Sequence, residues 1–462
     1  MKSNKVLLGL FAGVLALTGG SVRAQFYEIG PANIGGEVSS IVVDEQDASR
    51  TTVYAGAISG GLYVRTKKAT VLENLYANVT NAPVENLKRD TSSWHYVPLR
   101  DAQGNELNTL PISAMVQGPD GTIYIGTGDD RYAFGSTMSK MSLKGRGVYR
   151  YNPETGVCKM IAYTNPAMNS LFGAVRAMDW FYHNDTLYFF VASNTGLYRW
   201  TISDANSESD WSLDAKCVQG VSVESLVVSR TMGTAYFSSA RHMYRVGNVT
   251  ASNNAVNAVD ISSSNAVFGA DKGIIRMAMA PSDNRYLYAM LVDSNGVFDG
   301  VYVTLNGQSW NRVSTESVTP MNYTSGLTSG TLAVDPWDAR RVIIGGSDVW
   351  VGKGYSDGAY YMWTHSSYSE YMLNGGNYME QVFNSSVFVH SGIYQIIPVW
   401  TGEVMMYYIA TNGGVYSTKT NFNSYDNLNR GLNNVMINSV AVSPDGSVVS
   451  GARARQPRLC LR

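Results

Sequence analysis

Residues 42 to 66 read VVDEQDASRTTVYAGAISGGLYVRT, and this stretch decides the fold. An apolar run is followed by an acidic turn, a second apolar run, and a Gly-Gly pair that leads into a third run. Short runs of β-branched and aromatic residues between turn-forming residues predict antiparallel strands. The stretch is a single hairpin, an active site with two carboxylates, or one copy of a repeat, and the rest of the sequence separates these possibilities.

The same order of features recurs along the chain, which identifies the stretch as one unit of a repeat. Each unit has an apolar strand, a turn rich in Asp, Asn, Pro or Gly, and an aromatic or β-branched strand. From Ser39 to Asn438 the seven intervals average about 57 residues, a period typical of propellers and repeat arrays. The further units begin at SAMVQGPDG (113), RAMDWFYHN (176), ESLVVSRTMG (224), IRMAMAPSDN (275), GTLAVDPWD (330), SSVFVHSG (385) and NSVAVSPDG (438).

Most units carry two more strands after this hairpin. Third strands such as GLYVRT and GVYSTK are followed by expected fourth strands at 94–99, 156–163, 309–314 and 360–365. The first strands are apolar at consecutive positions, as is typical of inner strands packed on both faces. The sequence therefore predicts an all-β chain that forms a single β-propeller of four-stranded antiparallel blades. Seven blades are complete and an eighth is begun, so the ring is seven- or eight-bladed; a tandem of β-sandwiches is the alternative.

Three segments resemble a known group of propellers: IGPANIGGEVSSIVVDEQDASRTTVYAGAISGGLY (29–63), TLAVDPWDARRVIIGGSDVW (331–350) and YYIATNGGVYSTKTNF (407–422). They are similar to the sialidase-like BNR-repeat and sortilin-type propellers of many secreted bacterial proteins. The likeness extends over nearly the whole mature chain but consists of residues that build blades, so it implies the fold and leaves the function open. The group's Asp-box is degenerate here, since TLNGQSW (304–310) is one residue short and has Asn306 in place of Asp.

The two ends of the chain depart from the repeat. Residues 1–24 have Lys2 and Lys5, an apolar run of about 12 residues, and an Ala24 that ends an A-x-A-like site, which predicts a signal peptide rather than a membrane span. We therefore expect export to the periplasm, the cell surface or the medium, no transmembrane segment, and a mature propeller over 25–451. The basic tail 452–462 (ARARQPRLCLR) lacks a strand pattern, which suggests a truncation or frame change that leaves the last blade without its third strand. FYEIG (26–30) is expected to supply the outer strand of that blade; a genuine short tail is the alternative.

Composition excludes several classes of protein. A net charge of −1 provides no general attraction to nucleic acid. The five histidines are scattered singly and no Cys or His cluster has metal-ligand spacing, so no metal and no cofactor are expected. The cysteines Cys158, Cys217 and Cys460 allow one disulfide at most, and Cys158 with Cys217 either pair or remain as two buried thiols.

Candidate site residues were sought among carboxylates and aromatic rings. The resemblance implies an Arg-Ile-Pro motif for a sialidase, and this motif is missing, so sialidase activity is not expected. The acidic residues Asp44, Asp335 and Asp445 occupy equivalent turns after inner strands. Capping of the turn backbone by the side chain explains why an Asp recurs at these positions. The segment 129–132 opens an insertion (129–147) that could rim the axial mouth, and Trp180, Tyr182 and Trp200 could stack on a sugar or form core between blades. The candidate binding residues are Asp129, Asp130, Arg131, Tyr132, Trp180 and Tyr182.

Two functions remain open at this point. The first, which the missing catalytic motifs favour, is a non-catalytic secreted or cell-surface propeller that binds a protein or glycan partner through its loops. The second is a xyloglucanase-like polysaccharide hydrolase with a carboxylate pair across a cleft, because the two carboxylates of such enzymes need not be close in sequence.

Overall fold

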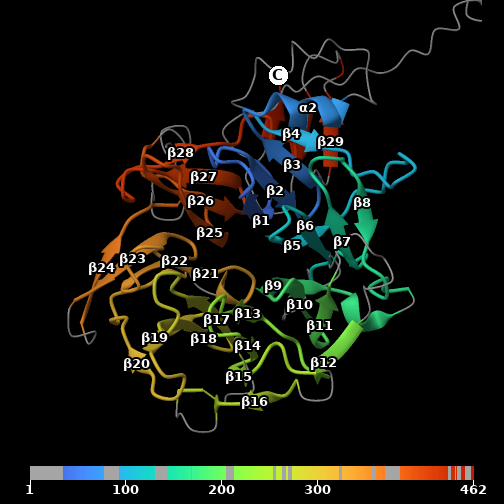
Figure 1. Cartoon of the computed structure of the whole chain (residues 1–462). Helices are drawn as coiled ribbons and strands as arrows, with labels where there is room; N and C mark the ends of the chain where they lie inside the picture. Colours follow the sequence, from blue (N-terminus) through green and yellow to red (C-terminus); the bar gives the residue numbers. More distant parts are fainter. Residues whose placement is uncertain are drawn as a thin grey trace, which may run out of the picture.

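The computed structural model gives the fold, and its described residues are 35–76, 93–130, 143–167, 169–203, 213–252, 256–262, 267–268, 273–321, 325–355, 360–369, 385–434, 439–442, 444, 449–452 and 459–461. Seven four-stranded antiparallel sheets are arranged in a ring, which makes the protein a seven-bladed β-propeller (Figure 1). The all-β propeller expected from the repeat is thereby confirmed. Among the described residues no helix is long and apolar enough to cross a membrane.

Each blade is built from four strands that follow one another in sequence. Blade 1 contains β1 (Val38–Val43), β2 (Val53–Ala57), β3 (Gly61–Arg65) and β4 (His95–Val97). Blade 2 contains β5 (Ile112–Gln117), β6 (Ile123–Thr127), β7 (Val148–Tyr151) and β8 (Cys158–Met160). Blade 3 contains β9 (Val175–His183), β10 (Thr186–Ser193), β11 (Gly196–Ile202) and β12 (Leu213–Gln219). Blade 4 contains β13 (Ser225–Val228), β14 (Ala235–Ser239), β15 (His242–Val246) and β16 (Ala258–Asp260).

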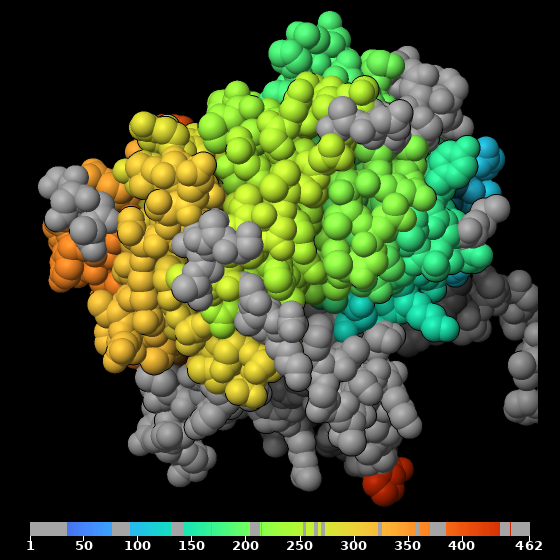
Figure 2. All heavy atoms as spheres, turned by 90° about the horizontal axis from the view of Figure 1, so that it is seen from below, coloured from blue at the N-terminus to red at the C-terminus, as the bar shows by residue number. Residues whose placement is uncertain are grey.

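The second half of the ring follows the same plan. Blade 5 contains β17 (Ile274–Met279), β18 (Leu287–Val292), β19 (Phe298–Thr304) and β20 (Asn311–Arg312). Blade 6 contains β21 (Thr331–Val334), β22 (Arg341–Gly345), β23 (Val349–Gly354) and β24 (Tyr361–His365). Blade 7 contains β25 (Ile393–Trp400), β26 (Met405–Thr411), β27 (Gly414–Thr418) and β28 (Asp426–Asn427). Figure 2 looks at the rim, where blades 3 to 6 lie side by side as successive bands from green to orange.

The ring closes between blade 7 and blade 1. The Gln395 side-chain oxygen accepts hydrogen bonds from the Ile41 backbone N–H at 2.6 Å and from the Ser40 hydroxyl at 3.1 Å. The Ser40 oxygen in turn accepts the Met115 N–H of blade 2 at 3.0 Å. Apolar side chains of β1 and β26, among them Ile41 and Tyr408, share one buried cluster. Seven blades therefore complete the circle.

The eighth repeat forms a separate three-stranded sheet of β29 (Ser439–Val442), β30 (Val449–Ala452) and β31 (Leu459–Leu461). The predicted lack of a third strand is wrong, because backbone pairing of β31 with β30 turns the segment Leu-Cys-Leu of the basic tail into a short strand. Blade 7 draws its four strands from 393–427. The predicted signal peptide 1–24, FYEIG and Asp445 lie outside the described residues.

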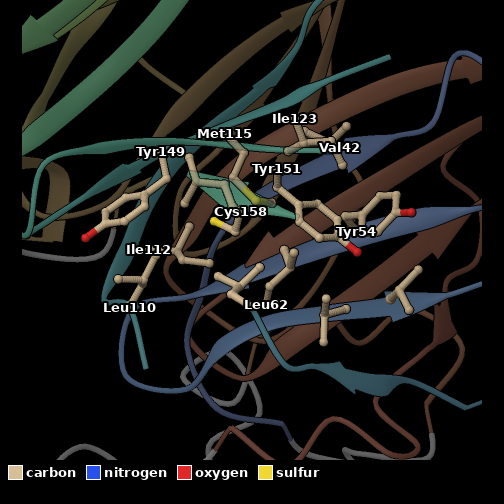
Figure 3. Close-up of a cluster of buried hydrophobic side chains, with 14 of the residues drawn as sticks. Val42, Tyr54, Leu62, Leu110, Ile112, Met115, Ile123, Tyr149, Tyr151 and Cys158 are labelled. Atoms are coloured by element: carbon tan, nitrogen blue, oxygen red, sulfur yellow. The ribbon is translucent and has the colours of Figure 1, made fainter. Parts of the chain in front are cut away.

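The core lies between adjacent blades. Figure 3 shows one such cluster, in which Val42, Tyr54 and Leu62 of blade 1 meet Met115 and Tyr151 of blade 2. Burial against aliphatic neighbours on both faces explains why the inner strands are apolar at consecutive positions. The same kind of packing recurs from blade to blade around the ring.

Cys158 and Cys217 are both buried, and no disulfide joins them. Burial raises the pKa of the Cys158 thiol to about 12, so this thiol stays protonated and unreactive at neutral pH. Of the two alternatives left open by the sequence, buried thiols are correct.

The fourth strands were only partly predicted. The four expected segments contain β4, β8, β20 and β24, whereas β12, β16 and β28 had no clear signal. The inner strand of blade 7 begins at Ile393, after the run SSVFVH that the pattern placed first. The helix α2 (Ala69–Tyr76) between β3 and β4 was missed; its Leu72 and Leu75 join the cluster between blades 1 and 2. With 8 residues, α2 has fewer than three turns, so the helical periodicity of its apolar residues is too short to recognise in the sequence.

Antiparallel strands divide the loops between two faces of the ring. Loops that join first to second and third to fourth strands, such as 44–52 and 335–340, lie on what we name the turn face. Loops that join second to third strands, and the links between blades, such as 58–60 and 128–130, lie on the opposite connection face. Any binding site on the ring draws its residues from one of these faces or from the rim.

Candidate binding face

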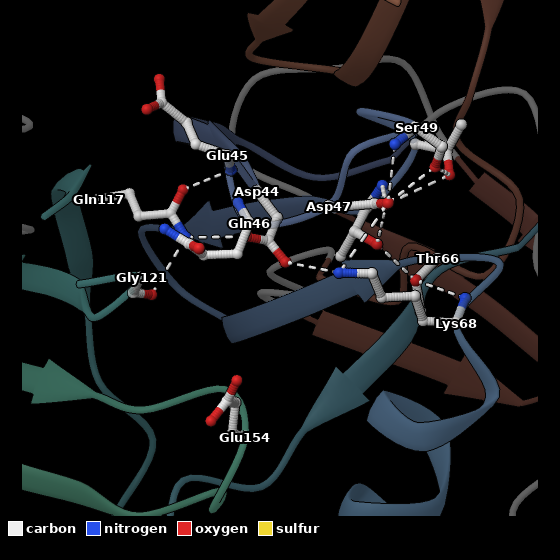
Figure 4. Close-up of polar contacts among 12 residues, drawn as sticks. Asp44, Glu45, Gln46, Asp47, Ser49, Thr66, Lys68, Gln117, Gly121 and Glu154 are labelled. Carbon is white, nitrogen blue, oxygen red and sulfur yellow. Dashed lines mark hydrogen bonds and ion pairs between the residues drawn. The ribbon is translucent and has the colours of Figure 1, made fainter. Parts of the chain in front are cut away.

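Two carboxylates of the opening stretch, Asp44 and Asp47, hold a turn of blade 1 (Figure 4). Asp47 accepts hydrogen bonds from the backbone N–H and hydroxyl of Thr52 at 2.9 and 2.7 Å, and from those of Ser49 at 3.1 and 2.8 Å. Asp44 accepts the Gln117 side-chain N–H of blade 2 at 2.9 Å. The Lys68 ammonium lies 3.5 Å from Asp44 and 3.9 Å from Asp47. These carboxylates therefore link blade 1 to blade 2 and cap a turn.

Hydrogen bonding also decides the ionisation of Asp47. Burial raises the pKa of the carboxyl group, but the bonds from Thr52 and Ser49 outweigh it and lower the pKa from 3.8 to about 2. The group is charged under all ordinary conditions. A carboxylate with such a low pKa is a poor general acid or base near neutral pH.

The equivalent turn of blade 6 works in the same way. Asp335 accepts the Trp337 N–H at 2.9 Å, the Arg341 guanidinium at 3.0 Å and the Tyr407 hydroxyl of blade 7 at 2.6 Å. Burial and the bond to this carboxylate raise the pKa of Tyr407. Turn capping, as expected from the sequence, is what Asp44 and Asp335 do.

The predicted insertion after β6 is described only at its two ends. Asp129 is buried, and its N–H donates to the Leu143 carbonyl at 3.0 Å. Asp130 forms an ion pair with Arg176 of β9 at 2.5 Å. The other two candidates of this segment, Arg131 and Tyr132, lie outside the described residues.

Arg176 joins two carboxylates on the connection face. Its second guanidinium nitrogen lies 3.0 Å from Glu224, which precedes β13 of blade 4. Ser222 donates to the other Glu224 oxygen at 2.8 Å, and Arg276 of blade 5 donates to the Glu224 carbonyl at 3.0 Å. Because Asp130 and Glu224 share one buried guanidinium, the cation lies between the two carboxylates and offsets part of their negative charge. This cluster is an ion network that connects blades 2 to 5 and not a carboxylate pair open to a sugar.

The predicted aromatic candidates have different surroundings. Trp200 is fully buried against Phe172 and Phe189, so it belongs to the core. The Trp180 indole N–H donates to the Gln117 carbonyl at 2.7 Å, and the Arg230 guanidinium covers the Trp180 ring at 3.9 Å from its centroid. Tyr182 is exposed on the turn face. Of these three rings, Tyr182 has the most accessible surface for a ligand.

The structure brings together four exposed aromatic side chains that the sequence interpretation did not select. We name Trp400, Trp337, Tyr355 and Tyr360 the aromatic row; they are 43%, 60%, 44% and 59% exposed. The ring centroids of Trp337 and Trp400 are 4.5 Å apart, with 60° between the planes. Those of Tyr355 and Tyr360 are 5.8 Å apart, with 37° between the planes. All four lie in or beside loops of the turn face in blades 6 and 7.

One loop, residues 335–340, connects the two aromatic pairs. It carries Trp337 toward Trp400 of blade 7, and its Arg340 donates to the Tyr355 carbonyl at 3.4 Å. The Gly354 N–H donates to the Arg340 carbonyl at 2.8 Å, which fixes the third-to-fourth-strand hairpin beside this loop. Asp338 and Arg340 lie between the pairs, 3.9 Å apart. The row is therefore a set of flat rings with polar groups in between.

A weak signal for the row exists in the sequence. Trp337 in the turn DPWDAR (335–340) and Tyr355 in YSDGA (355–359) lie where a turn, not a strand, is expected, and Tyr360 begins the expected strand 360–365. Large aromatic residues in turns have no core to fill, so exposure is the expected outcome. What the sequence does not reveal is that the two turns lie side by side next to Trp400.

Two shallow hollows are also present among the described residues. One of about 220 Å³ is lined by residues of blade 5 and the following loop, including Arg312, Glu316 and Met321. Another of about 320 Å³ lies between blade 1 and the segment that follows blade 7, with Tyr63, Trp94 and Tyr96 in its wall. Neither lining contains two carboxylates. No group of three or more metal-ligating side chains is found in the part of the chain that the structure describes.

Comparisons with known proteins support the fold only. No family model matches the sequence, and no curated protein matches it significantly. Among solved structures, the GH74 enzyme of Niastella koreensis aligns with a TM-score of 0.53 and 14% identity, over 92% of this chain and 59% of that one. U3-55K aligns at 0.47 and 10% identity over 84% and 94% of the two chains, and the Dos1 propeller at 0.45 and 10% over 92% of each. This chain thus spans less than two thirds of the GH74 enzyme, and the BNR-repeat or sortilin type stays a prediction.

Proposed function

We propose that this protein is an exported, non-catalytic β-propeller that binds a glycan through its turn face. The observation that carries the proposal is the aromatic row, which exposes Trp337, Trp400, Tyr355 and Tyr360 in or beside neighbouring loops of blades 6 and 7. Aromatic rings offer flat apolar surfaces with a negative π face, which suits the C–H face of a sugar ring. The export follows from the signal peptide expected in residues 1–24.

A glycan fits the row better than a protein partner does. The centre of a protein interface is depleted of charge and ringed by groups that exclude water. Here the charged Asp338 and Arg340 lie between the aromatic pairs. Alternating rings and polar groups match a sugar chain, whose apolar faces alternate with hydroxyl groups along its length.

Hydrolysis is the second candidate, because the propeller of a GH74 enzyme has the same fold. A glycosidase needs two carboxyl groups separated by the space for a glycosidic bond. Among the described residues, Asp44, Asp47 and Asp335 cap turns, and Asp130 and Glu224 share Arg176. These engagements favour binding without catalysis.

The test uses the mature chain from Gln25. It is run in native gels that contain a single soluble polysaccharide each, and the same polysaccharides are assayed for release of reducing ends. Retardation by at least one polysaccharide without release of reducing ends is the expected result. Release that Asp130→Asn abolishes would establish the hydrolase instead, and neither retardation nor release across the panel would refute glycan binding.

A further inference from the structure

We infer that the aromatic row takes an uncharged, extended polysaccharide at two cooperating subsites, one formed by Trp337 with Trp400 and the other by Tyr355 with Tyr360. The inference rests on the proposed glycan-binding function and assigns its site and ligand class. It follows from the ring geometry, from the rigidity of the supporting loop, and from the balance of charge around the rings.

The first subsite is formed by two indole rings that contact each other at an angle. Their centroids lie 4.5 Å apart with 60° between the planes, so one ring acts as a platform and the other as a side wall. The Trp337 backbone is held by Asp335, which Arg341 and Tyr407 also engage. A ring on a fixed loop loses little conformational entropy when a ligand binds, which increases affinity.

The second subsite lies on the hairpin that joins β23 to β24. Tyr355 and Tyr360 flank the hairpin, and the Tyr355 N–H donates to the Tyr360 carbonyl at 3.1 Å. The separation from Trp337 to Arg340 is three residues, which span at most roughly 10 Å of extended chain. Since Arg340 contacts the hairpin, the two pairs of rings lie within reach of one chain of several sugars.

The charges near the row cancel, which points to a neutral ligand. Asp338 is accompanied by Arg340, and Asp335 by Arg341. Recognition of an acidic polymer would need an excess of Arg or Lys with free donors. Two further exposed charges lie near the row, Glu403 in the loop after Trp400 and Lys353 two residues before Tyr355, and they are of opposite sign.

Two subsites on one rigid face predict a dependence on chain length. Once one pair of rings holds a sugar, the next part of the same chain is delivered to the second pair at high effective concentration. Affinity should rise with the number of sugar units until both pairs are covered and then level off. Disruption of either subsite should remove this gain.

The experiment compares neutral and acidic polysaccharides on the whole mature chain. The neutral probes are hydroxyethyl cellulose and galactomannan; the acidic probes are carboxymethyl cellulose and polygalacturonate. Dissociation constants from affinity electrophoresis are compared for Trp337→Ala, Trp400→Ala and the double variant Tyr355→Ala with Tyr360→Ala. We expect retention by a neutral probe, at least tenfold weaker binding in each variant, and tighter binding of hydroxyethyl cellulose than of carboxymethyl cellulose.

Two control variants separate the site from general effects. Met232→Ala removes an exposed apolar side chain from the same face in blade 4, and Tyr163→Asn removes an exposed ring from the connection face. Both should bind like the unaltered chain, and near-UV circular dichroism checks the fold of every variant. Binding that survives Trp337→Ala would overturn the assigned site but leave glycan binding intact. Preference for the acidic probes would overturn the ligand class, and a lack of binding to all probes would reject both this inference and the proposed function.

Discussion

Acidic residues in the turns of this propeller stabilise the ring one residue at a time. Asp47 is the best-supported example, because its carboxylate accepts five hydrogen bonds, two from Thr52, two from Ser49 and one from the Thr51 hydroxyl, and the Lys68 ammonium lies 3.9 Å away. A hydrogen bond to a charged acceptor contributes about 1.5–3 kcal/mol to the free energy of unfolding, which is more than a bond between neutral groups contributes. One turn residue can therefore have a measurable effect on the free energy of unfolding.

We predict that Asp47→Asn lowers the free energy of unfolding by about 1–3 kcal/mol at pH 7. The folded-state pKa of Asp47 is about 2, below the unfolded value of 3.8. The ionised Asp47 carboxylate therefore contributes its full stabilisation above about pH 4. This contribution is lost as the pH falls toward 2. The variant should therefore show a shallower loss of stability between pH 4 and pH 2, measured by urea unfolding at several pH values.

The matched control is Glu45→Gln in the same turn. The Glu45 side chain is 70% exposed and its nearest cation, Arg50, is 4.0 Å away. This substitution should change the free energy of unfolding by less than about 0.5 kcal/mol. Equal effects of the two substitutions would contradict the special role of Asp47.

At the level of strands, glycine sets how closely adjacent blades approach. Gly56 of β2, Gly126 of β6 and Gly345 of β22 occupy corresponding positions in their second strands. A Cβ atom on each would lie 2.4, 2.4 and 2.5 Å from Ile112, Val175 and Ile393, which begin or nearly begin the inner strand of the next blade. None of the three glycines has a positive φ, so space and not backbone conformation requires glycine here.

We predict that Gly126→Ala destabilises the protein by about 1–3 kcal/mol through overpacking. The lower entropy of alanine in the unfolded chain would favour folding by only about 0.4–1 kcal/mol, so the clash dominates. Adding Val175→Ala to this variant should recover part of the loss, because it removes the atom that lies 2.4 Å away. Thermal unfolding of the single and double variants measures the coupling.

Gly247→Ala is the corresponding control, since no atom lies within 4 Å of its added Cβ and its φ is not positive. We expect its stability to stay within about 0.5 kcal/mol of the unaltered chain. Destabilisation as large as that of Gly126→Ala would show that any side chain in place of glycine is harmful, irrespective of the neighbouring blade.

For the whole molecule, the critical event is closure of the ring. After blade 7 the chain crosses onto blade 1, where the Trp94 N–H donates to the Arg430 carbonyl at 2.9 Å and the Tyr63 hydroxyl donates to the Asn433 carbonyl at 2.8 Å. The Asn434 side chain accepts the Gly36 N–H at 2.7 Å and donates to the Glu37 carbonyl at 3.2 Å. These bonds connect residues from the two ends of the propeller sequence.

We predict that Asn434→Ala lowers the free energy of unfolding by about 1–3 kcal/mol, because the buried Gly36 N–H loses its acceptor. Amide hydrogen exchange should rise mainly in β1 and blade 7, which meet at the closure. The control Asn433→Ala changes an exposed side chain whose residue contributes only its backbone carbonyl to the closure, so it should leave exchange unchanged. Uniform faster exchange in all blades after Asn434→Ala would contradict a local role in closure.

The sequence by itself determined the blade and its repetition. Strands of one blade follow one another, so their pairing depends on nearby residues, and apolar runs and turn formers suffice to reveal it. The turn role of Asp44 and Asp335 was predictable for the same reason, since their partners include backbone groups two residues on. The weakest signals were the two-residue strands β20 and β28, whose length is below any recognisable pattern.

Only the tertiary structure decided which residues of different blades meet. The repeat allowed seven or eight blades, and the fit of blade 7 against blade 1 through Gln395 and Ile41 selected seven. Packing of neighbouring blades places Trp400 beside Trp337, covers Trp180 with Arg230, and puts Arg176 between Asp130 and Glu224. Contacts of this kind depend on the angle and distance between packed sheets, which are set by side-chain volumes across every blade interface and not by any local run of residues.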